Sequence, residues 1–115
     1  MIAGRRPAGD GRGREMEEKT GGVESNAKHI AGLMKLLANE NRLLIFCCLI
    51  DRSMTVGEMK RCIPKITQSA LSQHLALLRA HGVVDFVKTG QNVTYFIADE
   101  RVRALMGVLK ESFCK

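Results

Sequence analysis

Small polar side chains gather on one side of the segment from Thr67 to Leu75, which reads Thr-Gln-Ser-Ala-Leu-Ser-Gln-His-Leu. In a helix, the leucines at 71, 75 and 78 fall together, and the opposite side carries Gln68, Ser69, Ser72, Gln73 and Ala76. Gln and Ser match the hydrogen-bonding groups of base edges, and their small size allows a helix backbone to approach the major groove of DNA. His74 lies where the two sides meet, so it can either bond a phosphate or pack against the core. The pattern predicts a DNA-reading helix with Gln68, Ser69, Ser72, Gln73 and His74 as binding residues.

The charge distribution agrees with a polyanionic partner. The chain of 115 residues has 18 Lys and Arg against 12 Asp and Glu, a formal net charge of +6. An ordinary surface helix usually carries Glu and Lys pairs, yet no acidic residue occurs from Pro64 through Val84. The net charge alone fits an ordinary solvated basic surface equally well. Together with the polar helix face, it favours double-stranded DNA.

Four cysteines, at positions 47, 48, 62 and 114, are the other chemically reactive side chains. No secretory signal or membrane-length apolar run is visible, so we expect a cytoplasmic protein with reduced thiols and no disulfide framework. Cys48 is expected to be a small buried core residue. Cys62 lies in a basic stretch, where either a reactive or an inert thiol fits. His29, His74 and His81 are scattered, so we expect neither a metal site nor a cofactor.

These side chains must be positioned by a small set of helices. A first helix is expected over 25–38, and a second, apolar on most sides, over 39–50. Thr55 and Glu58 form a capping box that begins a short third helix, which must end near Cys62 because Pro64 disfavours helical geometry before it. A turn follows, and Thr67 begins a fourth helix that Gly82 stops.

The remainder predicts a wing and a last helix. Two strands over 83–88 and 93–97 flank Thr89-Gly90-Gln91-Asn92, which reads as a hairpin, and a final helix runs over 99–113. The expected fold is mainly α with a small β-hairpin, a winged helix-turn-helix. In such a fold Lys88 and Gln91 lie on the wing, where they can contact the DNA backbone or minor groove.

The beginning of the chain differs in composition from the rest. Residues 1–22 hold six of the eleven glycines, with Arg and Glu interleaved and almost no large apolar side chain. Such a segment cannot bury a core. We therefore expect a disordered Gly/Arg-rich tail over 1–22, and a single DNA-binding and dimerisation domain over 23–115.

The sequence resembles the ArsR/SmtB family of winged-helix repressors. The resemblance rests on three stretches: Leu37-Ala38-Asn39-Glu40-Asn41-Arg42-Leu43, Ser69 to Leu75 followed by Leu78-Arg79, and Gly90-Gln91-Asn92-Val93-Thr94-Tyr95. It covers about 27–114. The resemblance implies a homodimer through the first and last helices, and operator binding that ends when an inducer arrives. One departure is Pro64-Lys65, which makes the turn before the reading helix one residue longer than is usual in the family.

The positions of Cys47 and Cys114 resemble those in the BigR/SqrR/HlyU-like branch. Cys47 follows Asn-Glu-Asn-Arg-Leu-Leu-Ile-Phe, and Cys114 stands one residue from the end after an aromatic. The resemblance implies a dithiol that senses reactive sulfur species or oxidants and thereby releases DNA.

The sequence leaves two other functions open. The first is a metal- or metalloid-responsive repressor of the ArsR type, although the third helix lacks a Cys-x-Cys pair and the last helix lacks His. The second is a protein-interaction module without DNA binding. An enzyme is not expected, because no nucleophile-base set, Gly-rich phosphate loop or paired-ligand motif is present.

Overall fold

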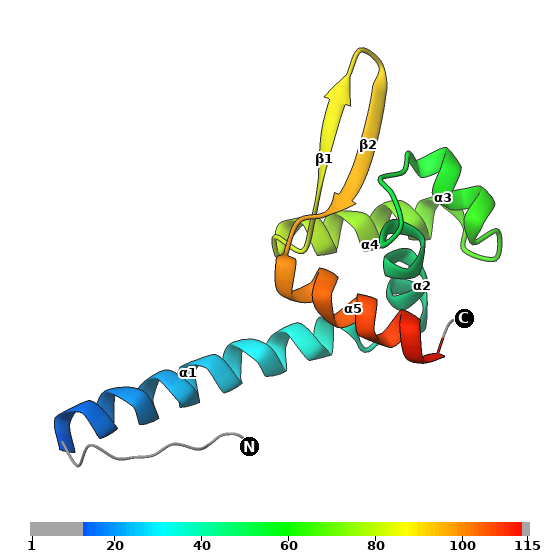
Figure 1. Cartoon of the computed structure of the whole chain (residues 1–115). Coiled ribbons are helices and arrows are strands. Elements are labelled where there is room, and N and C mark those ends of the chain that lie inside the picture. The colour runs from blue at the N-terminus through cyan, green and yellow to red at the C-terminus, as the bar shows by residue number, and fades with distance from the viewer. Residues whose placement is uncertain (1–12, 114–115) are drawn as a thin grey trace. The chain divides into compact units, whose positions relative to one another are not determined.

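The computed structural model describes residues 13–113, with side chains from residue 22 onward. Within these residues the chain forms five helices and one antiparallel hairpin (Figure 1). The elements are α1 (Gly13–Leu37), α2 (Glu40–Leu49), α3 (Val56–Cys62), α4 (Gln68–Ala80), β1 (Val84–Thr89), β2 (Asn92–Ile97) and α5 (Glu100–Phe113). The expected mainly α fold with a small hairpin is confirmed. The chain divides into two compact units, one ending at Lys35 and one beginning at Leu36.

The first unit contains most of α1, which is longer than expected. The helix begins at Gly13, so the predicted start at residue 25 is wrong. The segment over 14–19 consists of Arg, Glu, Met and Lys, whose high helix propensity outweighs the cost of the glycine pair at 21 and 22. The expected tail boundary at residue 22 falls inside this helix, and residues 1–12 lie outside the described part. The division into tail and domain stays a prediction.

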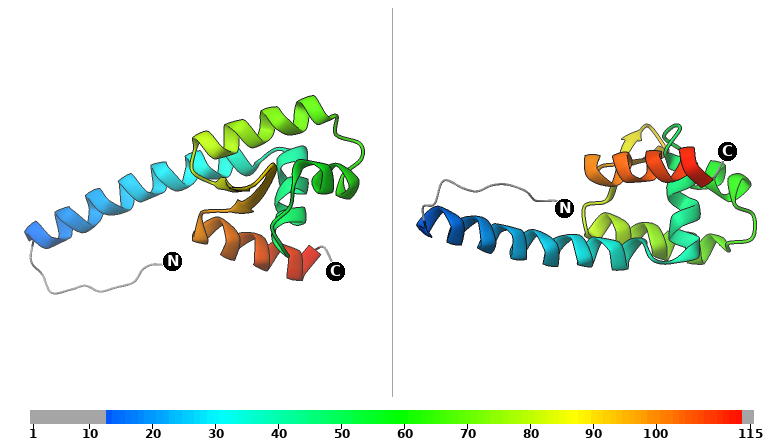
Figure 2. Two further views of the ribbon diagram at one scale, coloured as in Figure 1. Left: turned by 90° about the horizontal axis from the view of Figure 1, so that it is seen from above. Right: turned by 60° about the horizontal axis from the view of Figure 1, so that its bottom comes forward.

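The second unit is built around α2. Ile45, Phe46 and Leu49 are at most 1% exposed, and α2 contacts α3, α5 and β2. Both views in Figure 2 show α2 running between α4 and α5, with α3 at its side. The Asn39 side chain begins the helix by accepting a hydrogen bond from the Arg42 N–H at 3.1 Å. The expectation of a buried central helix is confirmed.

The helix pair α3 and α4 is bounded by the expected caps. Thr55 Oγ1 accepts from the Glu58 N–H at 3.1 Å, and Glu58 Oε1 accepts from the Thr55 N–H at 2.9 Å. Thr67 Oγ1 accepts from the Ala70 N–H at 3.1 Å and begins α4. After α4, Gly82 has φ of +74°, a conformation that side chains rarely adopt, and it turns the chain into the wing.

The wing is a hairpin in which Thr89 pairs with Asn92 and Val84 with Ile97. Gly90, with φ of +62°, makes the tight turn possible. Met54 and Tyr95 exchange two backbone hydrogen bonds, of 3.0 and 2.7 Å, which join the segment before α3 to β2. The wing and the start of α3 are therefore held together through the backbone.

The final helix α5 packs on the core through Val102 and Met106. Asp99 Oδ1 accepts from the N–H groups of Arg101 and Val102 at its start. The remaining apolar side chains of the expected stripe are less buried. Leu105 and Leu109 are half-buried, and Phe113 is 81% exposed. This helix therefore retains apolar surface after the chain has folded.

The capping box of α3 gives a first prediction. Thr55→Ala should lower the free energy of unfolding by about 1 kcal/mol, because the Glu58 N–H loses its acceptor at the start of a short helix. Urea unfolding followed by circular dichroism measures this. Ser53→Ala, at an exposed position two residues earlier, is the matched control and should change stability by less than about 0.5 kcal/mol. Equal effects of the two variants would contradict the role of the cap.

Candidate nucleic-acid interface

The two sides of α4 are sharply different. Leu71, Leu75 and Leu78 are at most 1% exposed and fix the helix on the core. The residues of the polar side, Gln68, Ser69, Ser72, Gln73 and Ala76, are all exposed. The structure thus brings four of the predicted reading residues onto one exposed helix surface. No acidic residue lies in α4, so its surface does not repel phosphate.

The turn between α3 and α4 is held by its own apolar residues. Ile63 and Ile66 are buried, and the Ile66 N–H donates to the Ile63 carbonyl oxygen at 3.2 Å. Lys60 Nζ donates to the Pro64 carbonyl oxygen at 2.7 Å, across the extended part of the turn. The extra length at Pro64-Lys65 is therefore absorbed by a compact loop, and the two helices still pack together.

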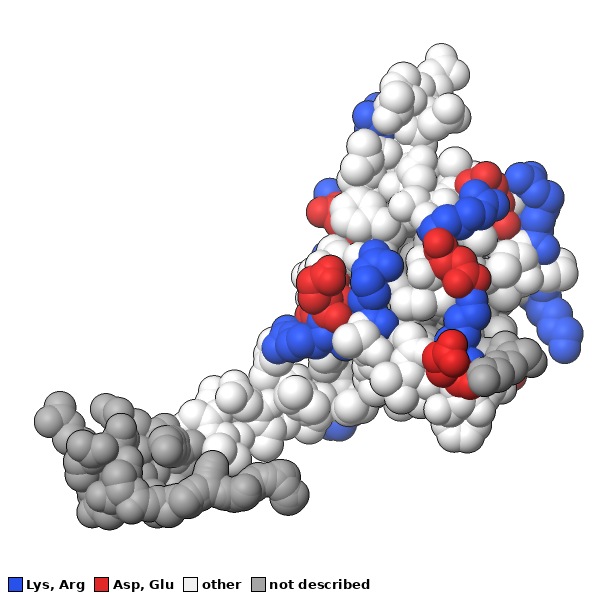
Figure 3. Space-filling model, in the orientation of Figure 1, with Lys and Arg blue, Asp and Glu red and all other residues white. Residues whose placement is uncertain are grey.

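Basic side chains gather at this end of the unit. Lys60, Arg61 and Lys65 surround the turn, and Figure 3 shows basic side chains grouped at the α3 side, whereas basic and acidic side chains alternate around α5. The visible face of the wing carries few charges. The positive charge thus lies around the last turn of α3 and the turn that leads to α4.

His74 differs from the other predicted reading residues because it is half-buried. Burial lowers the pKa of its imidazole below 6.5, and the positive charge of Arg42 lowers the pKa further. Arg42 is itself fixed, since its Nε donates to the Leu36 carbonyl oxygen at 2.6 Å. The neutral imidazole is therefore favoured, and His74 is better suited to a hydrogen bond than to an ion pair with phosphate.

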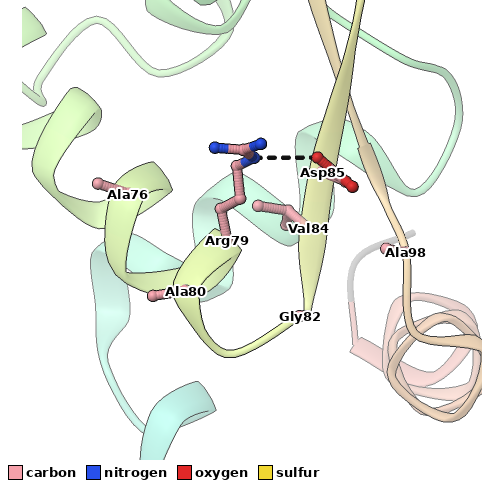
Figure 4. A pocket seen from close by; sticks show the side chains of 7 residues that line it. All are labelled: Ala76, Arg79, Ala80, Gly82, Val84, Asp85 and Ala98. Carbon is pink, nitrogen blue, oxygen red and sulfur yellow. Dashed lines mark hydrogen bonds and ion pairs between the residues drawn. The ribbon is translucent and has the colours of Figure 1, made fainter.

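Arg79 connects the end of α4 to the base of the wing. Its Nε donates to Asp85 Oδ1 at 3.0 Å, and its guanidinium lies 4.2 Å from the centre of the Phe86 ring. Figure 4 shows Arg79 directed across a shallow cavity of about 340 Å³ toward Asp85 on β1. The hydrogen bond from Arg79, together with one from the Phe86 N–H, lowers the pKa of Asp85. This contact couples the wing to α4.

The two predicted wing residues lie as expected on the hairpin. Lys88 is exposed near the end of β1, and Gln91 is exposed in the turn beside Gly90. The wing that the sequence predicted is therefore present, with both side chains available to solvent. Their contact with DNA stays a prediction.

One pair of cysteines, Cys48 and Cys62, is in a different oxidation state from the one expected. Cys47 is half-buried on α2, and Cys114 lies outside the described residues, so the pairing of these two stays a prediction. Cys48 and Cys62 are joined by a disulfide, with their Cα atoms 6.6 Å apart. The expectation of four thiols without a disulfide is therefore wrong for this pair. The reason is that Cys48 points toward the end of α3, which the position of α2 brings within bridging distance.

The described part of the chain contains neither a metal-binding cluster nor a membrane-crossing helix. No group of three or more His, Cys, Asp and Glu side chains in that part could hold a metal ion. Among the described helices, none has the length and apolar character needed to cross a bilayer.

The arrangement of α3, α4 and the wing is a winged helix-turn-helix. A family model described as HxlR-like helix-turn-helix matches residues 36–113. The chain belongs to this family. The transcriptional activator HlyU of Vibrio cholerae is 40% identical over 93 residues, 81% of this chain and 85% of that protein. The regulator YgaV of Escherichia coli is 37% identical over 93 residues, 80% of this chain and 93% of that protein.

Solved structures agree with these relatives. Reduced HlyU of V. cholerae has a TM-score of 0.75 at 40% identity and covers 81% of this chain and 97% of that one. The repressor BigR of Xylella fastidiosa has a TM-score of 0.75 at 30% identity and covers 83% of this chain and 93% of that one. The chain is thus a DNA-binding transcriptional regulator of the HlyU and BigR type. The expected resemblance to that branch is confirmed, and so is the expectation of a regulator rather than an enzyme.

Sequence reasoning missed three features of this HxlR-like protein. They are the contact of Arg79 with Asp85 and Phe86, the backbone pairing of Met54 with Tyr95, and the disulfide between Cys48 and Cys62. The opposite charges of Arg79 and Asp85, six residues apart around the Gly82 turn, were a usable signal for the first. The other two depend on how separate elements pack, and no local pattern marks them.

The environment of His74 gives a second prediction. Its pKa, measured by NMR titration, should lie below 6.5, and Arg42→Gln should raise it only part of the way because burial remains the larger cause. Arg52→Gln, which removes one exposed positive charge before α3, is the matched control and should leave the value unchanged. Because the pKa of His74 is lower in the folded protein, the unfolded chain binds the proton more readily. Protonation of His74 should therefore lower the free energy of unfolding as pH falls below about 6.5. A value above 6.5 in the native protein would contradict the assignment.

Proposed function

We propose that this HxlR-like protein is a cytoplasmic homodimeric repressor, which binds double-stranded operator DNA and releases it when Cys47 and Cys114 react with a persulfide or oxidant. The observation that carries the DNA-binding part is the exposed polar side of α4 above a fully buried leucine side. The regulators HlyU, YgaV and BigR support it.

In this proposal α4 enters the major groove. Gln68, Ser69, Ser72 and Gln73 read base edges, and the N–H groups of the first turn of α4 face phosphate. His74 donates a hydrogen bond as a neutral imidazole at the edge of the interface. Lys88 and Gln91 contact the backbone or minor groove from the wing, which Arg79 holds at a fixed place relative to α4.

Dimerisation is proposed through α1 and α5. On α1, Ile30 and Met34 are 41% and 46% exposed, and on α5, Val108 and Phe113 are 62% and 81% exposed. Apolar surface of this kind on two helices is typical of a dimer interface. Two copies of α4 can then occupy successive major grooves of a palindromic operator.

The switch is proposed to be the pair Cys47 and Cys114. One thiolate attacks the outer sulfur of a persulfide, takes that sulfur and releases a thiol. The second thiolate then attacks the inner sulfur of the protein persulfide and expels hydrosulfide, which leaves a disulfide. When both cysteines have first become persulfides, the terminal sulfur of one attacks the inner sulfur of the other and expels hydrosulfide, which leaves a trisulfide. Since Cys47 is on α2, a link from it to the end of α5 changes the spacing of helices next to the proposed dimer interface. The two reading helices then lose their register with the DNA.

The DNA-binding proposal gives a third prediction, measured by fluorescence anisotropy on a palindromic promoter fragment. Gln73→Ala should weaken operator binding about 5- to 150-fold with little effect on unrelated duplex, since a base contact contributes about 1–3 kcal/mol of discrimination. Lys88→Ala should weaken both duplexes alike and reduce the salt slope by about 1. Lys110→Ala, at an exposed ion pair with Asp51 away from α4 and the wing, is the matched control and should leave the slope unchanged. Binding without salt dependence would instead indicate a protein-interaction module.

The switch gives a fourth prediction. Cys114→Ser should bind the operator as tightly as the parent protein when reduced, but should no longer release it under a persulfide donor. Cys62→Ser, which removes a cysteine outside the proposed pair, is the matched control and should still be released, with binding restored by dithiothreitol. Release of Cys114→Ser would refute the two-thiol switch and leave the DNA-binding proposal standing. If the parent protein binds the operator tightly with and without the persulfide donor, the inducer is instead a metal or another ligand.

A further inference from the structure

The bridge between Cys48 and Cys62 joins two elements of different roles. Cys48 belongs to α2, the buried centre of the second unit, and Cys62 is the last residue of α3. The bridge therefore attaches α3 to the core at the point where the chain turns toward α4. Residues 48 and 62 are 14 apart in sequence, so the link closes a loop that contains all of α3.

The two sulfur positions differ strongly in access to solvent. Cys48 is 4% exposed, among the core side chains of α2, whereas Cys62 is exposed. Lys60, Arg61 and Lys65 lie close to Cys62 in sequence and supply positive charge around it. Positive charge near a thiol favours the thiolate, which is the nucleophilic form. Of the two, Cys62 is therefore the thiol that meets a dissolved oxidant first.

Cys62 also lines a groove that a small molecule can enter. The groove has a volume of about 500 Å³ and lies between the start of α2, at Glu40, Asn41 and Leu44, and the turn at Ile63, Pro64 and Lys65. A hydroperoxide or a small organic thiol is far smaller than this space. The groove thus provides a route to the sulfur of Cys62 that does not require α3 to move.

We propose that Cys62 is an oxidant-modification site for hydroperoxides, and that Cys48 resolves the oxidised product into the bridge. The Cys62 thiolate attacks the terminal oxygen of the hydroperoxide and forms a sulfenic acid; the O–O bond breaks and the alkoxide leaves, or hydroxide when the oxidant is hydrogen peroxide. The Cys48 thiol then attacks the Cys62 sulfur, the S–S bond forms, and water leaves. In sum, two thiols lose two hydrogens and one hydroperoxide is reduced to water and the corresponding alcohol, or to two waters when the oxidant is hydrogen peroxide.

This pair is separate from the switch proposed above. Cys47 and Cys48 are consecutive on α2, so their side chains point in directions about 100° apart. In the structure the bridge coexists with a complete helix pair and wing, so its formation is compatible with the DNA-reading arrangement. The Cys48–Cys62 bridge therefore strengthens the attachment of α3 under oxidant and does not release DNA.

The test uses the full chain carrying Cys47→Ser and Cys114→Ser, treated with equimolar hydrogen peroxide. We expect a mass loss of about 2 Da and a link between tryptic peptides 43–52 and 62–65, each of which then holds one cysteine. The melting temperature should rise by roughly 5–15 °C, because the bridge closes a loop in the unfolded chain, and dithiothreitol should reverse both changes. Operator affinity should change less than about twofold.

The matched control adds Cys62→Ser to the same background. Its buried Cys48 should stay unmodified at this dose, and its melting temperature should not rise. Conversion of Cys62 to the sulfinic acid without a link, or a link that leaves the melting temperature unchanged, would overturn the proposal. If the double variant does not fold, Cys47→Ser alone serves, since peptide 43–52 still holds only Cys48 and Cys114 lies on a different peptide.

Discussion

The burial of three leucines under α4 is the constraint on which the DNA-reading surface depends. Leu71, Leu75 and Leu78 are at most 1% exposed, so the helix has only one rotational setting that keeps them out of water. Burial of each leucine is favourable by about 2 kcal/mol, and turning the helix by one residue would expose them. That setting places Gln68, Ser69, Ser72 and Gln73 outward together. The orientation of the polar side is thus fixed by the buried leucines beneath it, and not by contacts of the polar side chains.

A DNA-reading helix can dock in a groove reproducibly only if the neighbouring helix and the wing keep fixed positions relative to it. Three contacts do this without using the polar side of α4. The turn at Ile63 and Ile66 packs α3 against it, Arg79 connects its last turn to Asp85 and Phe86, and the pairing of Met54 with Tyr95 joins the wing to the segment before α3. The exposed ion pair of Arg79 with Asp85 contributes little stability by itself, since solvent screens it. The combined effect of the three contacts is geometric: the wing and both helices form one connected unit.

Features set by local chemistry could be predicted from the sequence, and features set by packing could not. Thr55 with Glu58, Thr67 and Gly82 act on backbone groups within a few residues, so the bounds of α3 and α4 follow from residue types alone. The exposed polar side of α4 followed from periodicity in the same way. The predicted start of α1 is wrong because the helix-forming residues over 14–19 outweigh the glycines of that segment, a balance that composition alone does not settle. The Cys48–Cys62 bridge was missed because it depends on where α2 places Cys48 relative to the end of α3, and this position is decided by the whole core.

The central place of α2 explains why cysteine chemistry can matter to a regulator of this kind. Ile45, Phe46 and Leu49 bury α2 among α3, α5 and β2, so a covalent change on this helix acts on the elements that position the reading helix. Two consecutive cysteines on such a helix face different neighbours. A link from Cys48 reaches α3, within the unit that reads DNA, and preserves the arrangement of that unit. In the proposed switch, a link from Cys47 to Cys114 would instead join α2 to the residue that follows α5, a helix of the proposed dimer interface. In the two proposals, the Cys48–Cys62 bridge therefore fastens each reading unit, whereas the Cys47–Cys114 link changes the distance between the two copies, because a tightly packed helix transmits displacement to its neighbours.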